Sequence, residues 1–93
     1  MEIFMKIKSG FVVQKVGGSY LAVAVGKRAD DFNAMIRMNS TGAFLWDLLS
    51  SKDMTEEELV SALVSEYSIT EELAACDTAK IVGALREAGL LDE

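Results

Sequence analysis

Apolar and polar residues alternate along much of the first third of the chain, with the period of two that is typical of β-strands. The runs 11–16 and 20–25 are rich in β-branched and aromatic residues. Residues 17–19 between them read Gly-Gly-Ser and can supply the positive φ of a tight hairpin turn. Residues 32–38 alternate again, so this part of the chain predicts a three-stranded antiparallel sheet.

Two flanking segments complete this first part. Residues 1–8 also alternate, and we expect residues 1–4 to be either flexible or an extra strand. Residues 26–31 are polar and are expected to form a turn before the third strand.

From residue 39 onward the apolar spacing becomes helical. A helix around Trp46 is expected to begin at Asn39 or Ser40, whose side chains can accept a hydrogen bond from the first turn. Thr55 and Glu58 form a capping-box pattern ahead of a second helix, whose buried side chains are expected to be Leu59, Val60, Leu63, Val64 and Tyr67.

A last helix is predicted over residues 71–88, with Thr70 before it and Gly89 ending it in a left-handed conformation. Its apolar and small residues cover an arc of about 200°, wider than the stripe of about 100° that a surface helix needs. Either this helix is deeply buried, or a second apolar flank is available to a partner. The whole pattern predicts an α+β fold, winged helix-turn-helix-like, as one domain over residues 1–93.

Composition narrows the class of protein. The chain has 93 residues, 51% of them apolar, and no proline, which favours an ordered globular domain. No apolar run is long enough for a membrane span and no signal peptide is evident, so we expect a cytoplasmic protein without a membrane partner. A single cysteine, Cys76, and the lack of histidine predict no metal site, no cofactor and no catalytic residues. An enzyme is therefore not expected.

Charge is unevenly distributed around a net value of −6. Residues 1–37 carry six basic and three acidic side chains, about +3, whereas residues 38–93 carry three basic and twelve acidic ones, about −9. This is either ordinary solvation of helix surfaces or a bipolar surface that orients a charged partner. A winged helix that binds DNA needs basic side chains on its recognition helix. The acidic helices argue against a nucleic-acid partner.

Several local motifs occur in a characteristic order. They are Met5-Lys6-Ile7-Lys8-Ser9-Gly10-Phe11-Val12-Val13, Phe32-Asn33-Ala34-Met35-Ile36, Asn39-Ser40-Thr41-Gly42, Leu45-Trp46-Asp47-Leu48-Leu49, Thr55-Glu56-Glu57-Glu58-Leu59 with Tyr67, and Leu85-Arg86-Glu87-Ala88-Gly89-Leu90-Leu91. In these motifs the chain resembles the PqqD family, named from pyrroloquinoline quinone biosynthesis and also called RiPP recognition elements. Met38 stands where the family often has leucine, a change that conserves volume. Residues 1–4 lie outside the resemblance.

The resemblance implies a non-catalytic peptide chaperone. Such proteins bind the leader of a ribosomally synthesised precursor peptide by strand addition and present it to a modifying enzyme, often a radical SAM protein. The leader would lie on the third strand, against the last helix. The residues that the resemblance implies for this peptide-binding groove are Phe32, Asn33, Ala34, Met35, Ile36, Arg37, Leu73, Ala74, Asp77, Ile81, Ala84 and Leu85.

Three alternatives stay open at this level. The third strand could pair with its twin in a homodimer, since an uncovered edge invites pairing. A winged-helix DNA-binding protein is the less favoured alternative. Residues 1–8 could also occupy the groove in the free protein.

Three side chains of the first helix, Trp46, Phe44 and Leu48, are interpreted as core residues that lock the third strand against the helices, not as a binding site.

Overall fold

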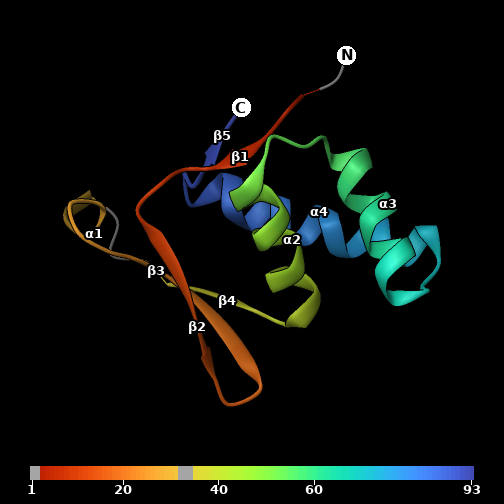
Figure 1. Ribbon diagram of the computed structural model, residues 1–93, viewed down its shortest axis with the longest axis horizontal. Coiled ribbons are helices and arrows are strands. Elements are labelled where there is room, and N and C mark those ends of the chain that lie inside the picture. Colours follow the sequence, from red (N-terminus) through yellow and green to blue (C-terminus); the bar gives the residue numbers. More distant parts are fainter. Residues whose placement is uncertain (1–2, 32–34) are drawn as a thin grey trace.

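The computed structural model describes residues 3–31 and 35–93 and joins a small sheet to a layer of helices (Figure 1). Its elements are β1 (Lys6–Ile7), β2 (Phe11–Val16), β3 (Ser19–Ala24), α1 (Arg28–Asp31), β4 (Ile36–Met38), α2 (Ser40–Ser51), α3 (Glu56–Tyr67), α4 (Glu71–Glu87) and β5 (Leu91–Asp92). The predicted α+β fold is confirmed.

The sheet has the strand order β2-β3-β4, antiparallel throughout. Gly17 adopts φ +62° in the hairpin turn, and Val16 pairs with Ser19 across it. Such a positive φ costs little only without a Cβ atom, which explains the glycine. In β4, Met38 pairs with Tyr20 of the central strand. The described part of this third strand is short, because it covers only Ile36–Met38 of the predicted residues 32–38.

The polar segment 26–31 contains a short helix, α1, where the sequence predicts only a turn. The amides of Ala29 and Asp30 donate to the carbonyls of Gly26 and Lys27, at 3.1 and 3.2 Å. A single helical turn of this kind has no apolar periodicity, so the hydrophobic pattern could not reveal it.

The predicted helix caps are confirmed by their hydrogen bonds. The Asn39 side chain accepts from the amide of Gly42 at 2.9 Å, which starts α2 immediately after β4. Thr55 and Glu58 form both bonds of the capping box, at 2.9 and 3.1 Å. Thr70 caps α4 in the same way as Asn39 caps α2, with a bond of 3.2 Å. These caps define where each helix begins.

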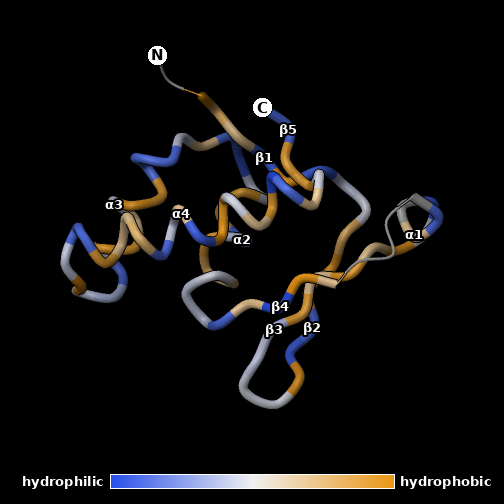
Figure 2. Tube along the Cα trace, turned by 180° about the vertical axis from the view of Figure 1, so that it is seen from behind, coloured by the Kyte–Doolittle hydropathy of each residue, from blue (hydrophilic) through white to orange (hydrophobic). Residues whose placement is uncertain are grey.

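The core is built mainly from the three longer helices. Trp46 of α2 is 4% exposed, so it is the core residue that the sequence predicts. Its ring meets that of Phe11 edge-on, with centroids 6.4 Å apart, which ties α2 to β2 and not to the third strand. Tyr67 was predicted to be buried but is 38% exposed, its ring resting edge-on against Phe44. Hydrophobic and hydrophilic segments alternate within the helices and strands, and the turn between β2 and β3 is close to neutral (Figure 2). The fully buried aliphatic side chains include Leu45, Leu49, Leu59, Leu63, Val82 and Leu85.

The N-terminal segment forms a second, separate sheet. Ile7 of β1 pairs with Leu91 of β5, and Met5 exchanges backbone hydrogen bonds of 2.8 and 2.9 Å with Met54. The hypothesis that residues 1–8 occupy the groove is therefore wrong for residues 5–8, because their backbone groups bond to residues 90–92 and to Met54.

An ion pair supports this second sheet. Arg86 of α4 contacts the Glu93 carboxylate at 2.6 Å. The hydrogen bond that Arg86 donates lowers the pKa of Glu93. No helix in the described part of the chain is long and apolar enough to cross a membrane.

Thr78 on the buried face of α4 provides a test of the packing. Its side chain is fully buried, and its hydroxyl has no hydrogen-bond partner among the residues that the structure describes. Burying an unpaired hydroxyl costs about 1–3 kcal/mol. Thr78→Val is therefore expected to raise the free energy of unfolding by about 1 kcal/mol, measured by urea denaturation.

Thr41→Val is the matched control, because the Thr41 hydroxyl donates to the Asn39 side chain at 2.8 Å. This control is expected to leave stability unchanged or lower it. A loss of stability in Thr78→Val would mean that the Thr78 hydroxyl is satisfied in solution.

Candidate functional site

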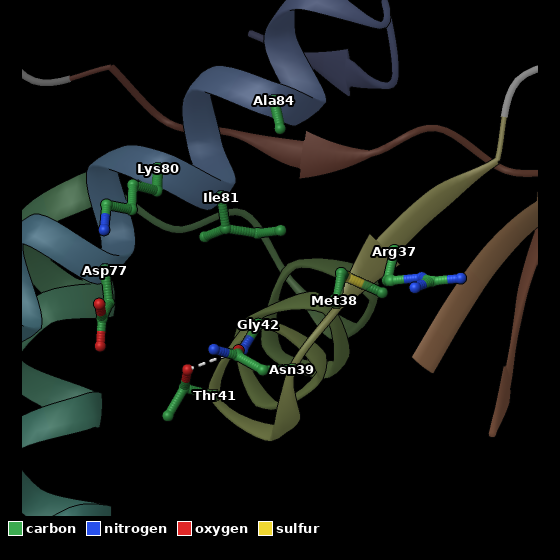
Figure 3. Close-up of a pocket in the computed structure, with 9 residues that line it drawn as sticks. All are labelled: Arg37, Met38, Asn39, Thr41, Gly42, Asp77, Lys80, Ile81 and Ala84. Atoms are coloured by element: carbon green, nitrogen blue, oxygen red, sulfur yellow. Dashed lines mark hydrogen bonds between the residues drawn. The ribbon is translucent and has the colours of Figure 1, made fainter. Parts of the chain in front are cut away.

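A groove of about 190 Å³ lies between the end of β4, the first turn of α2 and one flank of α4 (Figure 3). Two segments that are distant in sequence meet there, residues 37–42 and residues 77–84. The lining residues are Arg37, Met38, Asn39, Thr41, Gly42, Asp77, Lys80, Ile81 and Ala84. Among the described strands β4 is an outer one, so the groove runs beside an edge of the sheet.

The α4 side of the groove is one helical row. Asp77, Ile81 and Ala84 follow each other at spacings of four and three residues, which places them on the same flank of a helix. In Figure 3 these residues run from Asp77 at one end of the groove to Ala84 at the other, and Ile81 points toward Met38. The flank is therefore apolar along most of its length and polar at one end.

The opposite side depends on a close approach at Gly42. A Cβ atom added there would lie 3.1 Å from the Cβ of Met38 and 3.5 Å from the Cδ1 of Ile81. A contact of 3.1 Å is tighter than nearly all real Cβ contacts. The missing side chain thus allows the first turn of α2 to sit against both the strand and α4.

The charged groups at the groove have few partners. Asp77 is half-buried and Lys80 is exposed, and neither forms an ion pair or hydrogen bond within the described ranges 3–31 and 35–93. The guanidinium of Arg37 points away from both in Figure 3, so this residue lines the groove near its backbone. The groove therefore offers a carboxylate and an ammonium at the end where α4 faces the start of α2.

Four residues of the predicted site line the groove, namely Arg37, Asp77, Ile81 and Ala84. Others lie around it: Met35 is 66% exposed, Ile36 is half-buried, and Leu73 is 49% exposed one turn before Asp77. Phe32, Asn33 and Ala34 lie outside the described residues.

Ala74 and Leu85 need a correction. Both side chains are fully buried in the core, so they cannot touch a ligand in this structure. They were included because they belong to the wide apolar arc of α4. Helical spacing shows that an arc is broad, but only packing shows which part of it the core covers.

Five lining residues were missed by sequence reasoning: Met38, Asn39, Thr41, Gly42 and Lys80. A signal existed for Lys80, which lies three residues after Asp77 on the same helix flank. The start of α2 could not be placed in the groove from sequence, because its contact with α4 is a tertiary one.

The groove is equipped for binding an extended chain. An outer strand offers backbone groups for another strand, and the apolar flank of α4 can receive alternate side chains. Within the described ranges, no cluster of three or more His, Cys, Asp or Glu side chains could hold a metal. The described free thiol, Cys76, is exposed on α4 and does not line the groove.

These features define a winged-helix-like α+β domain with a strand-and-helix groove. The sequence model of the family described as Coenzyme PQQ synthesis protein D (PqqD) matches residues 15–91, which is most of the chain. The chain belongs to the PqqD family.

Two solved structures share the fold. One is TbiB1 in complex with the TbiA(beta) leader peptide, with a TM-score of 0.67, 22% identity and 94% of each chain covered. The other is lasso peptide synthetase B1 complexed with the leader peptide, with a TM-score of 0.67, 19% identity, and 96% of this chain and 98% of that one covered. No curated protein sequence matches the chain.

Two glycines in helices give a matched test of the close approach. Gly42→Ala places a Cβ 3.1 Å from Met38, whereas Gly83→Ala in α4 meets nothing within 4 Å. Gly83→Ala is expected to raise the free energy of unfolding by about 0.5–1 kcal/mol through helix propensity. Gly42→Ala is expected to lower it by about 1 kcal/mol, because overpacking outweighs that gain.

Both free energies of unfolding are to be measured by chemical denaturation. Equal stabilisation by the two substitutions would show that Met38 and Ile81 yield easily, and that Gly42 does not define the groove.

Proposed function

We propose that this protein binds the leader segment of a ribosomally synthesised precursor peptide and presents it to a modifying enzyme. The leader adds as a strand to the outer edge of β4 and lies against the flank of α4. The protein itself performs no chemistry in this proposal; it holds the peptide.

The observation that carries the proposal is the groove beside β4. An outer strand has backbone N–H and C=O groups on one side that can pair with an added strand, which supplies affinity without regard to side chains. Alternate side chains of the added strand then face α4, where Ile81 and Ala84 offer apolar contact. The groove thus has the two parts that strand addition requires.

The comparisons support the same reading. Both solved structures that share this fold are complexes with a leader peptide. The match to the PqqD family covers residues 15–91, and so includes β4 and the whole of α4. The occupant that we propose for this groove is accordingly a leader segment.

The modifying enzyme that we propose as partner is a radical SAM protein, on the strength of the family resemblance. The competing proposal is a homodimer formed through an outer strand, which the same free edge would support. The two differ in one respect: strand pairing between copies depends on protein concentration, whereas leader binding depends on the peptide.

A groove-filling substitution tests the proposal. Ala84 lines the groove and is exposed, so Ala84→Arg places a long charged side chain in the path of the leader without disturbing the core. We expect affinity to fall at least about tenfold, roughly 1.4 kcal/mol. The probe is a fluorescein-labelled synthetic peptide with the leader sequence of a candidate precursor, and its affinity is measured by fluorescence anisotropy.

Ala79→Arg is the matched control. Ala79 is exposed on α4, five residues away and outside the groove lining, so binding should be unchanged.

Peptide binding should also shift the amide NMR signals of residues 35–37 and 73–84 together. Shifts confined to α3, or equal binding by both arginine variants, would refute the proposed site. Concentration-dependent sedimentation without peptide binding would favour the homodimer.

A further inference from the structure

The groove-facing row of α4 extends one turn beyond the groove. Leu73, Asp77 and Ile81 are spaced by four residues each, so they share one flank of the helix. Leu73 is 49% exposed, so its side chain is available for contact one turn before Asp77. The row therefore presents an apolar side chain, a carboxylate and a second apolar side chain in succession.

The spacing of this row matches that of an extended peptide. Eight helical residues separate Leu73 from Ile81, which corresponds to about 12 Å along the helix axis. Four residues of an extended strand span about 13 Å, and alternate side chains point to the same side. Consider a peptide strand that runs along α4 and places one of its side chains on Ile81. The peptide residue four positions further along would then lie on Leu73. The peptide residue midway between these two would lie opposite Asp77.

The chemistry at the midpoint is set by Asp77. Its carboxylate is half-buried and forms no ion pair or hydrogen bond within the part of the chain that the structure describes. A partly buried carboxylate is best satisfied by a charged donor. Lys80, three residues on, makes no ion pair with it and is exposed, so its flexible stem can turn to solvent.

The geometry points to a leader segment whose helix-facing side chains are apolar, cationic and apolar at alternate positions. Leu73 and Ile81 receive the two apolar residues, four positions apart, and Asp77 receives a lysine or arginine midway between them. Leu73 and Asp77 are thereby specificity-determining residues. This inference rests on the proposed function and adds to it the class of sequence that the groove selects.

Selection from a random peptide library tests the inference without knowledge of the natural leader. The probe is an mRNA-display library of peptides of about ten random residues, comparable to a long strand, selected on the immobilised full chain. We expect apolar–x–Lys/Arg–x–apolar segments to be enriched at least about tenfold over the starting library. The same selection is repeated on Leu73→Ser, Asp77→Lys and Asp77→Asn.

Each variant has a distinct expected result. Asp77→Lys should change the preferred midpoint residue from Lys or Arg to Asp or Glu, and Asp77→Asn should abolish the charge preference. Leu73→Ser should remove the preference for one apolar residue while the other persists. Glu87→Lys, an exposed charge reversal on α4 outside the groove lining, and Val16→Ala, an exposed apolar residue on β2, serve as controls that should leave the wild-type pattern unchanged.

The outcomes separate this inference from the function on which it rests. The inference is overturned if peptides bind in the groove but show no such spacing. It is also overturned if Asp77→Lys does not change the preferred charge at the midpoint. Either result leaves the proposed function standing. Enrichment of no peptide by the folded wild-type chain, checked by circular dichroism, overturns both.

Discussion

The structure depends on the way α4 divides its surface between core and groove. One row of this helix, which includes Ala74, Val82 and Leu85, is fully or almost fully buried among the side chains of the other helices. The neighbouring row, with Asp77, Ile81 and Ala84, is left at the groove. Because a well-packed interior has little free volume, the buried row holds the helix in place. The open row is thereby presented at a fixed distance from the sheet.

The other wall of the groove is placed by its neighbours. The described part of β4 has only three residues, too few to hold a position alone. It is held on one side by its pairing with β3 and at its end by α2, which begins immediately after it at the Asn39 cap. Gly42 brings this corner against Ile81, and Trp46 with Phe11 joins α2 to the hairpin. Strand, corner and helix therefore act as one rigid frame.

The small sheet of β1 and β5 stabilises the other end of α4. Met5 is almost completely buried and bonds to Met54, so the N-terminal segment covers the core between α3 and the chain's last strand. The ion pair between Arg86 and Glu93 adds little energy of its own, because both side chains are partly exposed to solvent. β5 is held mainly by its pairing with β1 and by the buried side chain of Leu91. The peptide segments that close this end are separate from those that form the groove.

Much of this architecture could be predicted from the sequence alone, because local chemistry encodes it. Alternating apolar residues and a Gly-Gly turn define the hairpin, and the side chains of Asn39, Thr55 and Thr70 mark where helices begin. These interactions join residues close together in the chain, so they leave a readable pattern. The short helix α1 was missed because a single turn has no periodicity.

The groove itself was decided by tertiary structure. The sequence showed that α4 has a wide apolar arc but not which part of it the core would cover, so Leu85 and Ala74 were assigned to the site although both are buried. That Gly42 and Thr41 line the groove could not be predicted from the sequence either. Their position depends on the contact between α2 and α4, which lies more than thirty residues further along the chain. Helical periodicity is a property of one element, whereas a groove is a property of the space between elements.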